Sequence, residues 1–109
     1  MEIRRDVFQA IADPTRRAIL GLVALQAMTP GAIAEKFDSS RQTISKHIQI
    51  LNECELLNQT QSGRAIYYQL NPKKMKEIAD WLDPYRKIWE SRFTAMEDIL
   101  NEMQSEKLS

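Results

Sequence analysis

The fold follows from the stretch Ser39-Ser40-Arg41-Gln42-Thr43-Ile44-Ser45-Lys46-His47-Ile48-Gln49-Ile50-Leu51. Its apolar residues recur at helical spacing on one side, at Ile44, Ile48 and Leu51. The other side carries hydrogen-bonding side chains, and no carboxylate occurs between Asp38 and Glu53. Because such a face suits phosphates and base edges, the stretch predicts a nucleic-acid-contacting helix over Arg41–Cys54.

Two helices are predicted shortly before this one, and each opens with a capping residue followed by proline. Asp13-Pro14 begins the first, whose apolar residues indicate a central core helix: Ile19, Leu20, Leu22, Val23 and Leu25. Thr29-Pro30 begins the second, and a further short helix is expected over Val7–Ile11. Residues 29–54 therefore predict a helix-turn-helix, in which the shorter helix braces the longer one for entry into the major groove.

Two β-prone runs follow, Leu56–Gln61 and Ala65–Leu70, on either side of a turn that contains Gly63. They predict a hairpin, the wing, over 56–70. C-terminal helices are expected over 72–106, with Asp83-Pro84 either beginning the last helix or bending into it. The predicted fold is mostly α with a small β-hairpin. It is a single winged helix-turn-helix domain over 1–109 with a long C-terminal dimerisation helix.

The composition describes an ordinary chain of 109 residues with a formal net charge of zero. Its basic residues in the middle and acidic residues near the end suit a localised basic surface. No apolar run approaches the roughly 20 residues that cross a bilayer, and the N-terminus does not resemble a signal peptide. With a single cysteine as well, these features predict a cytoplasmic protein.

The first turns of the predicted recognition helix are expected to contact bases, and its start to hold phosphate. Arg64 at the hairpin tip is expected to reach the minor groove or a phosphate, and Gln49 to reach the DNA backbone. The alternative for the helix is a solvated amphipathic surface. The predicted DNA-binding residues are Ser40, Arg41, Gln42, Thr43, Ser45, Lys46, Gln49 and Arg64.

The C-terminal helix carries an apolar stripe too large for a small domain to cover. A second copy of the chain is the expected cover, with help from the first helix, and this predicts a homodimer. The alternative, that the helix folds back on its own core, is compatible with dimerisation. The predicted interface residues are Val7, Phe8, Ile11, Tyr85, Trp89, Phe93, Met96, Leu100 and Met103.

Four ordered segments resemble the ArsR-type family of bacterial winged-helix regulators. Val7 to Leu20 is similar to the family's opening, Met28 to Glu35 to its brace helix, Ser40 to Ile48 to its recognition helix and Gly63 to Leu70 to its wing. The tail from Trp81 to Phe93 is similar to a metal-free branch. The resemblance implies a homodimeric repressor of a short palindromic DNA operator, with autorepression as one form of this role.

The chain has one Cys and one His, too few for a transition-metal site within one subunit, so neither metal nor cofactor is expected. His47 is expected to pack or hydrogen-bond within the domain, and Cys54 to be a core residue. No nucleophile–base arrangement or phosphate-binding glycine loop is present, so an enzyme is not expected. The alternatives are a winged-helix protein-interaction module and a small-molecule-responsive regulator.

Overall fold

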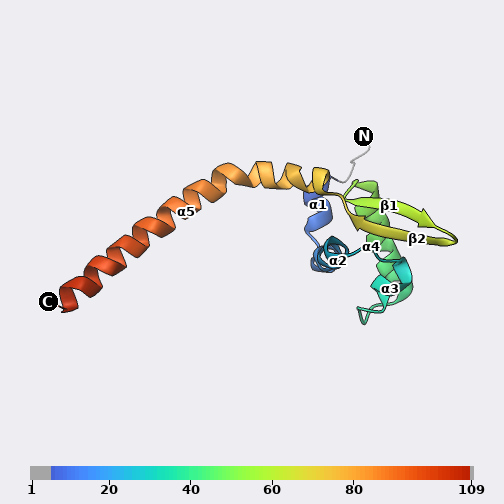
Figure 1. The fold of residues 1–109 in the computed structure, drawn as a ribbon, viewed down its shortest axis with the longest axis horizontal. Helices are drawn as coiled ribbons and strands as arrows, with labels where there is room; N and C mark the ends of the chain where they lie inside the picture. The colour runs from blue at the N-terminus through green and yellow to red at the C-terminus, as the bar shows by residue number, and fades with distance from the viewer. Residues whose placement is uncertain (1–5, 109) are drawn as a thin grey trace. The chain divides into compact units, whose positions relative to one another are not determined.

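The structure, a computed structural model, describes residues 6–108 (Figure 1). The chain divides into two compact units, of which one ends at Ile78 and the other begins at Ala79. The elements are α1 (Val7–Ile11), α2 (Pro14–Leu25), α3 (Pro30–Ala34), α4 (Arg41–Glu53), β1 (Leu57–Ser62), β2 (Ala65–Leu70) and α5 (Pro72–Leu108). This order confirms the predicted fold class, a mostly helical chain with one antiparallel hairpin and a long C-terminal helix.

Each of the first four helices begins at a side chain that accepts a hydrogen bond from the first turn. Asp13 accepts from the Arg16 N–H at 3.0 Å, Thr29 from the Ala32 N–H at 3.1 Å, and Ser40 from the Thr43 N–H. Asp6 forms a capping box at the start of α1. The helix starts predicted from the sequence are therefore correct, because capping depends on residues three apart in the chain.

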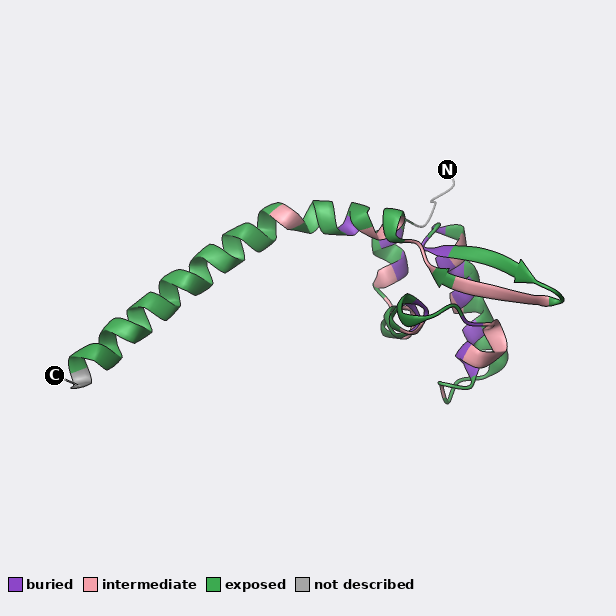
Figure 2. Ribbon diagram, viewed as in Figure 1, coloured by how far each residue is buried: buried purple, intermediate pink, exposed green. Residues whose placement is uncertain are grey.

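The core of the first unit takes side chains from α2, α3 and α4 (Figure 2). The largest fully buried side chains are Ile19, Val23, Ile33, Ile44, Leu51 and Leu56. The predicted core helix is confirmed by the burial of Ile19, Leu20 and Val23, but Leu25 at its end is 86% exposed and does not contribute to the core. Leu25 follows the buried Val23 by two positions, so its side chain points to the opposite side of α2, in the last turn of that helix.

The wing is a two-stranded antiparallel hairpin, with Leu57 opposite Leu70 and Ser62 opposite Ala65. Its two-residue loop places Gly63 at φ 62°, the left-handed conformation that glycine adopts without a steric cost. β1 contacts α4, and β2 contacts α2 and α3. Adjacent elements of the helix-turn-helix and the wing thus support one another.

A pair of backbone hydrogen bonds joins the wing to the segment just before α3. Met28 and Tyr68 exchange them, with N···O distances of 2.9 and 2.8 Å. No sequence periodicity indicated this bridge, since Met28 lies outside both β-prone runs. It holds the start of the brace helix α3 against β2.

The turn after α4 has an unusual backbone, because Glu55 adopts φ 64° without being glycine. Asn71 fixes this turn through its side-chain amide, which donates to the Glu55 carbonyl at 2.8 Å, and through its N–H, which donates to the Leu56 carbonyl. The Glu55 carboxylate lies 3.5 Å from Lys74 Nζ on the surface. The turn is therefore held by tertiary hydrogen bonds against a local steric cost.

The second unit is the part of α5 from Ala79 onward, and the sequence had left open whether a helix began or bent at Pro84. The structure shows one helix with Pro84 inside it. Asp83 pairs with Arg86 at 3.4 Å and with Lys87 at 3.2 Å, and such pairs one turn apart stabilise the turn that follows the proline. Of the helices that the structure describes, none combines the length and apolar character needed to cross a membrane.

The backbone of Glu55 generates a first prediction. Glu55→Gly should raise the free energy of unfolding by about 0.5–1 kcal/mol relative to Glu55→Ala, because glycine alone removes the left-handed steric cost. Both variants lack the surface ion pair with Lys74, so the comparison isolates the backbone. Urea denaturation measures the difference. Equal stability of the two variants would contradict a left-handed Glu55.

Candidate nucleic-acid interface

The helix α4 separates its side chains into a buried and an exposed face, as the sequence predicted. Ile44, Ile48 and Leu51 are between 0 and 3% exposed and lie in the core. The residues proposed from the sequence to contact DNA are all exposed: Ser40, Arg41, Gln42, Thr43, Ser45, Lys46, Gln49 and Arg64. The structure brings seven of them together on α4 and its cap, and places Arg64 in the hairpin loop.

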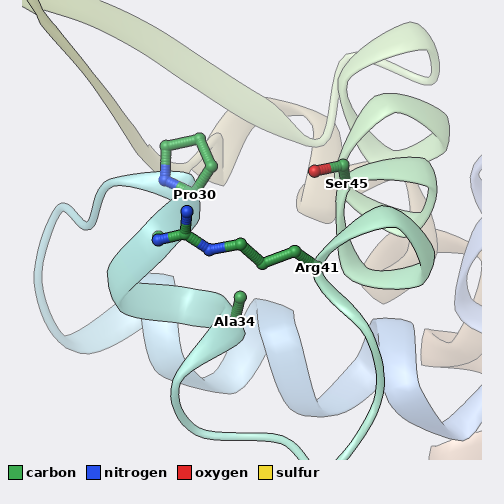
Figure 3. A pocket seen from close by; sticks show the side chains of 5 residues that line it. Pro30, Ala34, Arg41 and Ser45 are labelled. Carbon is green, nitrogen blue, oxygen red and sulfur yellow. The ribbon is translucent and has the colours of Figure 1, made fainter.

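Arg41 and Ser45 face a small hollow between α3 and α4 (Figure 3). The hollow has a volume of about 150 Å³ and is lined by Pro30, Gly31, Ala34, Arg41 and Ser45. The Arg41 side chain extends from the first residue of α4 toward the brace helix α3. Its charged end therefore lies at the junction of the two helices.

At the start of α4, two hydroxyl side chains are hydrogen-bonded to each other. The Ser40 and Thr43 hydroxyl oxygens lie 2.9 Å apart, and the Ser40 hydroxyl also accepts from the Thr43 N–H. One helical turn after Ser45, the Gln49 amide donates to a Glu53 carboxylate oxygen at 3.3 Å. Gln49 thus has an acceptor within its own helix, and Glu53 marks where the carboxylate-free face ends.

The cations of this surface have no carboxylate partners within residues 6–108. Arg41, Lys46 and Arg64 are exposed, and the described structure contains no ion pair or hydrogen bond from their side-chain nitrogens. By contrast, Lys74 contacts the carboxylates of Glu55 and Glu77 at 3.5 and 3.1 Å. Unpaired cations beside a carboxylate-free helix face suit an anionic polymer such as DNA.

A polar cluster ties the recognition helix to α1 and α2. The Arg16 guanidinium donates to the Ala10 carbonyl at 2.7 Å and to the Gln9 carbonyl at 3.1 Å, and its Nη1 lies 3.3 Å from His47 Nδ1. Asp13 Oδ2 is 3.9 Å from the same ring nitrogen. A ring that accepts from Arg16 at Nδ1 carries its proton on Nε2. His47 therefore hydrogen-bonds within the domain, as the sequence favoured.

The sequence did not predict what Arg16 and Arg17 do. Like Arg16, Arg17 donates to carbonyls at the end of α1, at 2.8 Å to Ile11 and 3.2 Å to Ala12. Cationic side chains commonly satisfy the last carbonyls of a helix in this way. The acceptors lie only five to seven positions before each arginine, but the sequence does not show that the chain reverses there.

The predicted dimer-interface residues fall into two groups. The six on α5, from Tyr85 to Met103, are each between 49 and 64% exposed. On α1, Phe8 is 38% exposed and Ile11 is partly buried, whereas Val7 is only 3% exposed and belongs to its own subunit's core. Cys54 is also in that core, at 5% exposure. Exposed apolar side chains are thus present along α5, Phe8 of α1 is partly exposed, and Val7 is buried.

Potential metal ligands do not converge in the described structure, since no three side chains of His, Cys, Asp or Glu among residues 6–108 lie together in a suitable group. The nearest arrangement around the single histidine joins His47 to one carboxylate and one guanidinium. A guanidinium beside the ring nitrogen opposes a bound cation there, because the two positive charges repel each other.

Comparison with known proteins identifies similar regulators. A helix-turn-helix domain family matches residues 11–60. The transcriptional repressor SdpR of Bacillus subtilis (strain 168) is 43% identical over 77 residues, which cover 71% of this chain and 86% of SdpR. The arsenical resistance operon repressor of Staphylococcus xylosus is 30% identical, over 71% of this chain and 74% of that repressor. Among solved structures, an ArsR-like transcriptional regulator from Rhodococcus sp. RHA1 has a TM-score of 0.69 and 29% identity, and 88% of each chain is covered.

The cap of α2 generates a pH-dependent prediction. The hydrogen bond from the Arg16 N–H holds the pKa of the Asp13 carboxyl below its ordinary value, and the positive charge of Arg16 adds to this effect. A lowered pKa in the fold stabilises it fully above the unfolded pKa of 3.8, and this stabilisation disappears as the pH falls through the folded value. Asp13→Ala should therefore lower the free energy of unfolding by about 1 kcal/mol at pH 7.

The difference in free energy of unfolding between the wild type and Asp13→Ala should stay constant above about pH 3.8 and become smaller below it. Urea denaturation across this range measures the difference. Asp13→Asn is the matched control, since its amide oxygen still caps the helix but does not ionise. A difference that is the same at pH 7 and pH 3 would show that the Asp13 charge does not stabilise the cap.

Proposed function

Because this chain belongs to the ArsR family of winged helix-turn-helix transcriptional regulators and is a DNA-binding regulator, we propose that it is a homodimeric repressor of a short palindromic operator. The names of two relatives, both repressors, support the direction of the regulation. A protein with this role works where the DNA is, so we expect it in the cytoplasm. We propose no catalytic activity for it.

One observation carries the assignment of the DNA-reading surface. The helix α4 buries Ile44, Ile48 and Leu51 and thereby presents a polar, carboxylate-free face from Arg41 to Asn52. Burial of one helix face fixes the direction of the other, and the brace α3 contacts α4 as a helix-turn-helix requires. We propose that this face enters the major groove, with Arg64 of the wing touching the neighbouring backbone or minor groove.

The apolar stripe on α5 supports the homodimer. Trp89 and Phe93 are 64 and 49% exposed, and their rings stack at a centroid distance of 5.3 Å. Burying one large apolar side chain contributes about 1.5–3 kcal/mol of favourable free energy. A dimer in which a second copy covers this stripe is therefore stabilised. A twofold dimer presents two recognition helices about 34 Å apart, one turn of DNA, which matches a palindrome.

We further propose that the regulator does not sense metal through its own side chains. The ligands of a transition-metal site are thiolates, imidazoles and carboxylates in groups of three or four. One Cys that is 5% exposed in the core and one His hydrogen-bonded to Arg16 do not supply such a group. If an inducer exists, a small organic molecule is a better candidate than a metal ion.

A binding experiment tests the reading face. Duplexes selected by the protein from a random pool should share a palindromic sequence, and binding should weaken steeply as salt is raised. Gln42→Ala and Lys46→Ala should each reduce the affinity for the selected duplex about tenfold or more, because both side chains lie in the first turns of α4. Fluorescence anisotropy measures the affinities.

The control is Lys73→Ala, at an exposed lysine in the first turn of α5, outside the helix-turn-helix and the wing, and it should bind like the wild type. Wild-type affinity in both Gln42→Ala and Lys46→Ala would show that another surface reads the DNA. An absence of binding to any duplex at low salt would favour the alternative of a protein-interaction module.

A second experiment tests the dimer. Trp89→Glu should convert the protein to a monomer in analytical ultracentrifugation and weaken operator binding, because a charge in the stripe opposes its burial. Thr94→Glu is the matched control, since it places the same charge on the opposite face of α5, about 140° away at 100° per residue. If the wild type is a monomer at micromolar concentration, or if both variants stay dimeric, α5 is not the interface.

A further inference from the structure

We propose that Arg41 binds the DNA backbone rather than a base, and that Gly31 of α3 positions it for this contact. The proposal rests on the proposed function, because it divides the recognition surface into a phosphate-binding part and a base-reading part. It changes the role expected for Arg41 and Ser45 from the sequence, and it gives a role to Gly31, which no pattern in the sequence had assigned.

The position of the Arg41 side chain is the first observation. A Cβ atom placed on Gly31 would lie 2.9 Å from Arg41 Nη2 and 3.9 Å from Arg41 Cζ. The guanidinium therefore occupies space that any other residue at position 31 would take. Figure 3 shows Arg41 crossing from the start of α4 to the brace helix, with its charged end beside Pro30. It does not extend along the outer face of α4.

The surroundings of the guanidinium suit an oxyanion. The Ser45 hydroxyl faces the same hollow of about 150 Å³ (Figure 3), so a guanidinium and a hydroxyl donor converge on it. In the described part of the chain no carboxylate pairs with Arg41, and the remaining lining residues Pro30, Gly31 and Ala34 are uncharged. A guanidinium binds phosphate oxygens in a two-pronged geometry with charge-assisted hydrogen bonds.

The docking geometry indicates which part of DNA this hollow meets. When a helix-turn-helix binds, the second helix lies in the major groove and the first crosses the sugar–phosphate backbone. The Arg41 guanidinium lies beside that first helix, α3, and so beside the element that meets phosphates. Phosphate contacts fix the register of the protein but do not discriminate sequence. Base reading then falls to the outer-face side chains Gln42 and Lys46.

The test uses four variants and two duplexes: one selected from a random pool by the wild type, and one with the same base composition in shuffled order. The variants are Arg41→Ala, Gly31→Ala, the double variant Gly31→Ala with Arg41→Ala, and Gly21→Ala. Gly31→Ala moves only the end of a flexible side chain, and alanine favours a helix, so its melting temperature should be at least that of the wild type. Gly21→Ala is the matched control, because a Cβ on this α2 glycine meets nothing within 4 Å.

Arg41→Ala should weaken binding by the same factor, about tenfold or more, on both duplexes. The slope of log affinity against log salt should become shallower by about 1.8, because each subunit of the dimer would neutralise one phosphate fewer. Gly31→Ala should weaken binding by up to the same factor, but should change nothing further when it is added to Arg41→Ala. Gly21→Ala should bind like the wild type.

Three results would overturn the proposal. The first is wild-type affinity of Gly31→Ala for both duplexes. The second is an equal effect of Gly31→Ala on affinity whether or not the Arg41→Ala substitution is also present. The third is a weakening by Arg41→Ala that is confined to the selected duplex and leaves the salt slope unchanged, which would make Arg41 a base reader.

A failure of the proposed function would look different from these three results. A wild type that does not prefer the selected duplex over the shuffled one would overturn the operator-reading function. The salt slopes of the wild type and Arg41→Ala on the shuffled duplex would still test the phosphate contact, because phosphate binding does not depend on base order.

Discussion

Burying one face of α4 governs the other features of this molecule. Ile44 and Leu51 have no exposed surface and Ile48 has 3%. Each such side chain contributes about 1.5–3 kcal/mol when buried, so rotating the helix to any other angle is costly. Since neighbouring residues lie about 100° apart around a helix, fixing this face also fixes which polar side chains point to solvent. The proposed DNA-reading surface is therefore a consequence of the core.

Polar contacts then fix the positions of α1, α3, α4 and the wing relative to one another. Apolar burial alone constrains these positions less, because it has no direction. Arg16 joins the end of α1 to His47 on α4, and the Met28–Tyr68 bridge joins the start of α3 to the wing. Hydrogen bonds are directional and are costly to leave unmade, so each of these links has one satisfactory geometry. The brace, the recognition helix and the wing are thereby held as one surface.

From Ala79 onward the long helix α5 has the opposite character, with its apolar side chains exposed and a group of ion pairs between Asp83 and Glu90. Arg86 pairs with Asp83 at 3.4 Å and with Glu90 at 3.7 Å, one turn away in each direction. These pairs stabilise the helix without needing a core. In the proposed homodimer the exposed aromatic side chains contact a second copy, so that two subunits would match two operator half-sites.

The helix starts, the hairpin with its glycine turn, and the two faces of α4 could all be predicted from the amino-acid sequence, because each depends on residues only a few positions apart. Other features emerged only in the folded chain: Arg41 lies over Gly31, Arg16 and Arg17 cap α1, Met28 pairs with Tyr68, and Val7 faces its own core while Leu25 faces solvent. These features depend on where the chain returns in space. Periodicity and capping are local properties, and they do not specify which distant residues a side chain will meet.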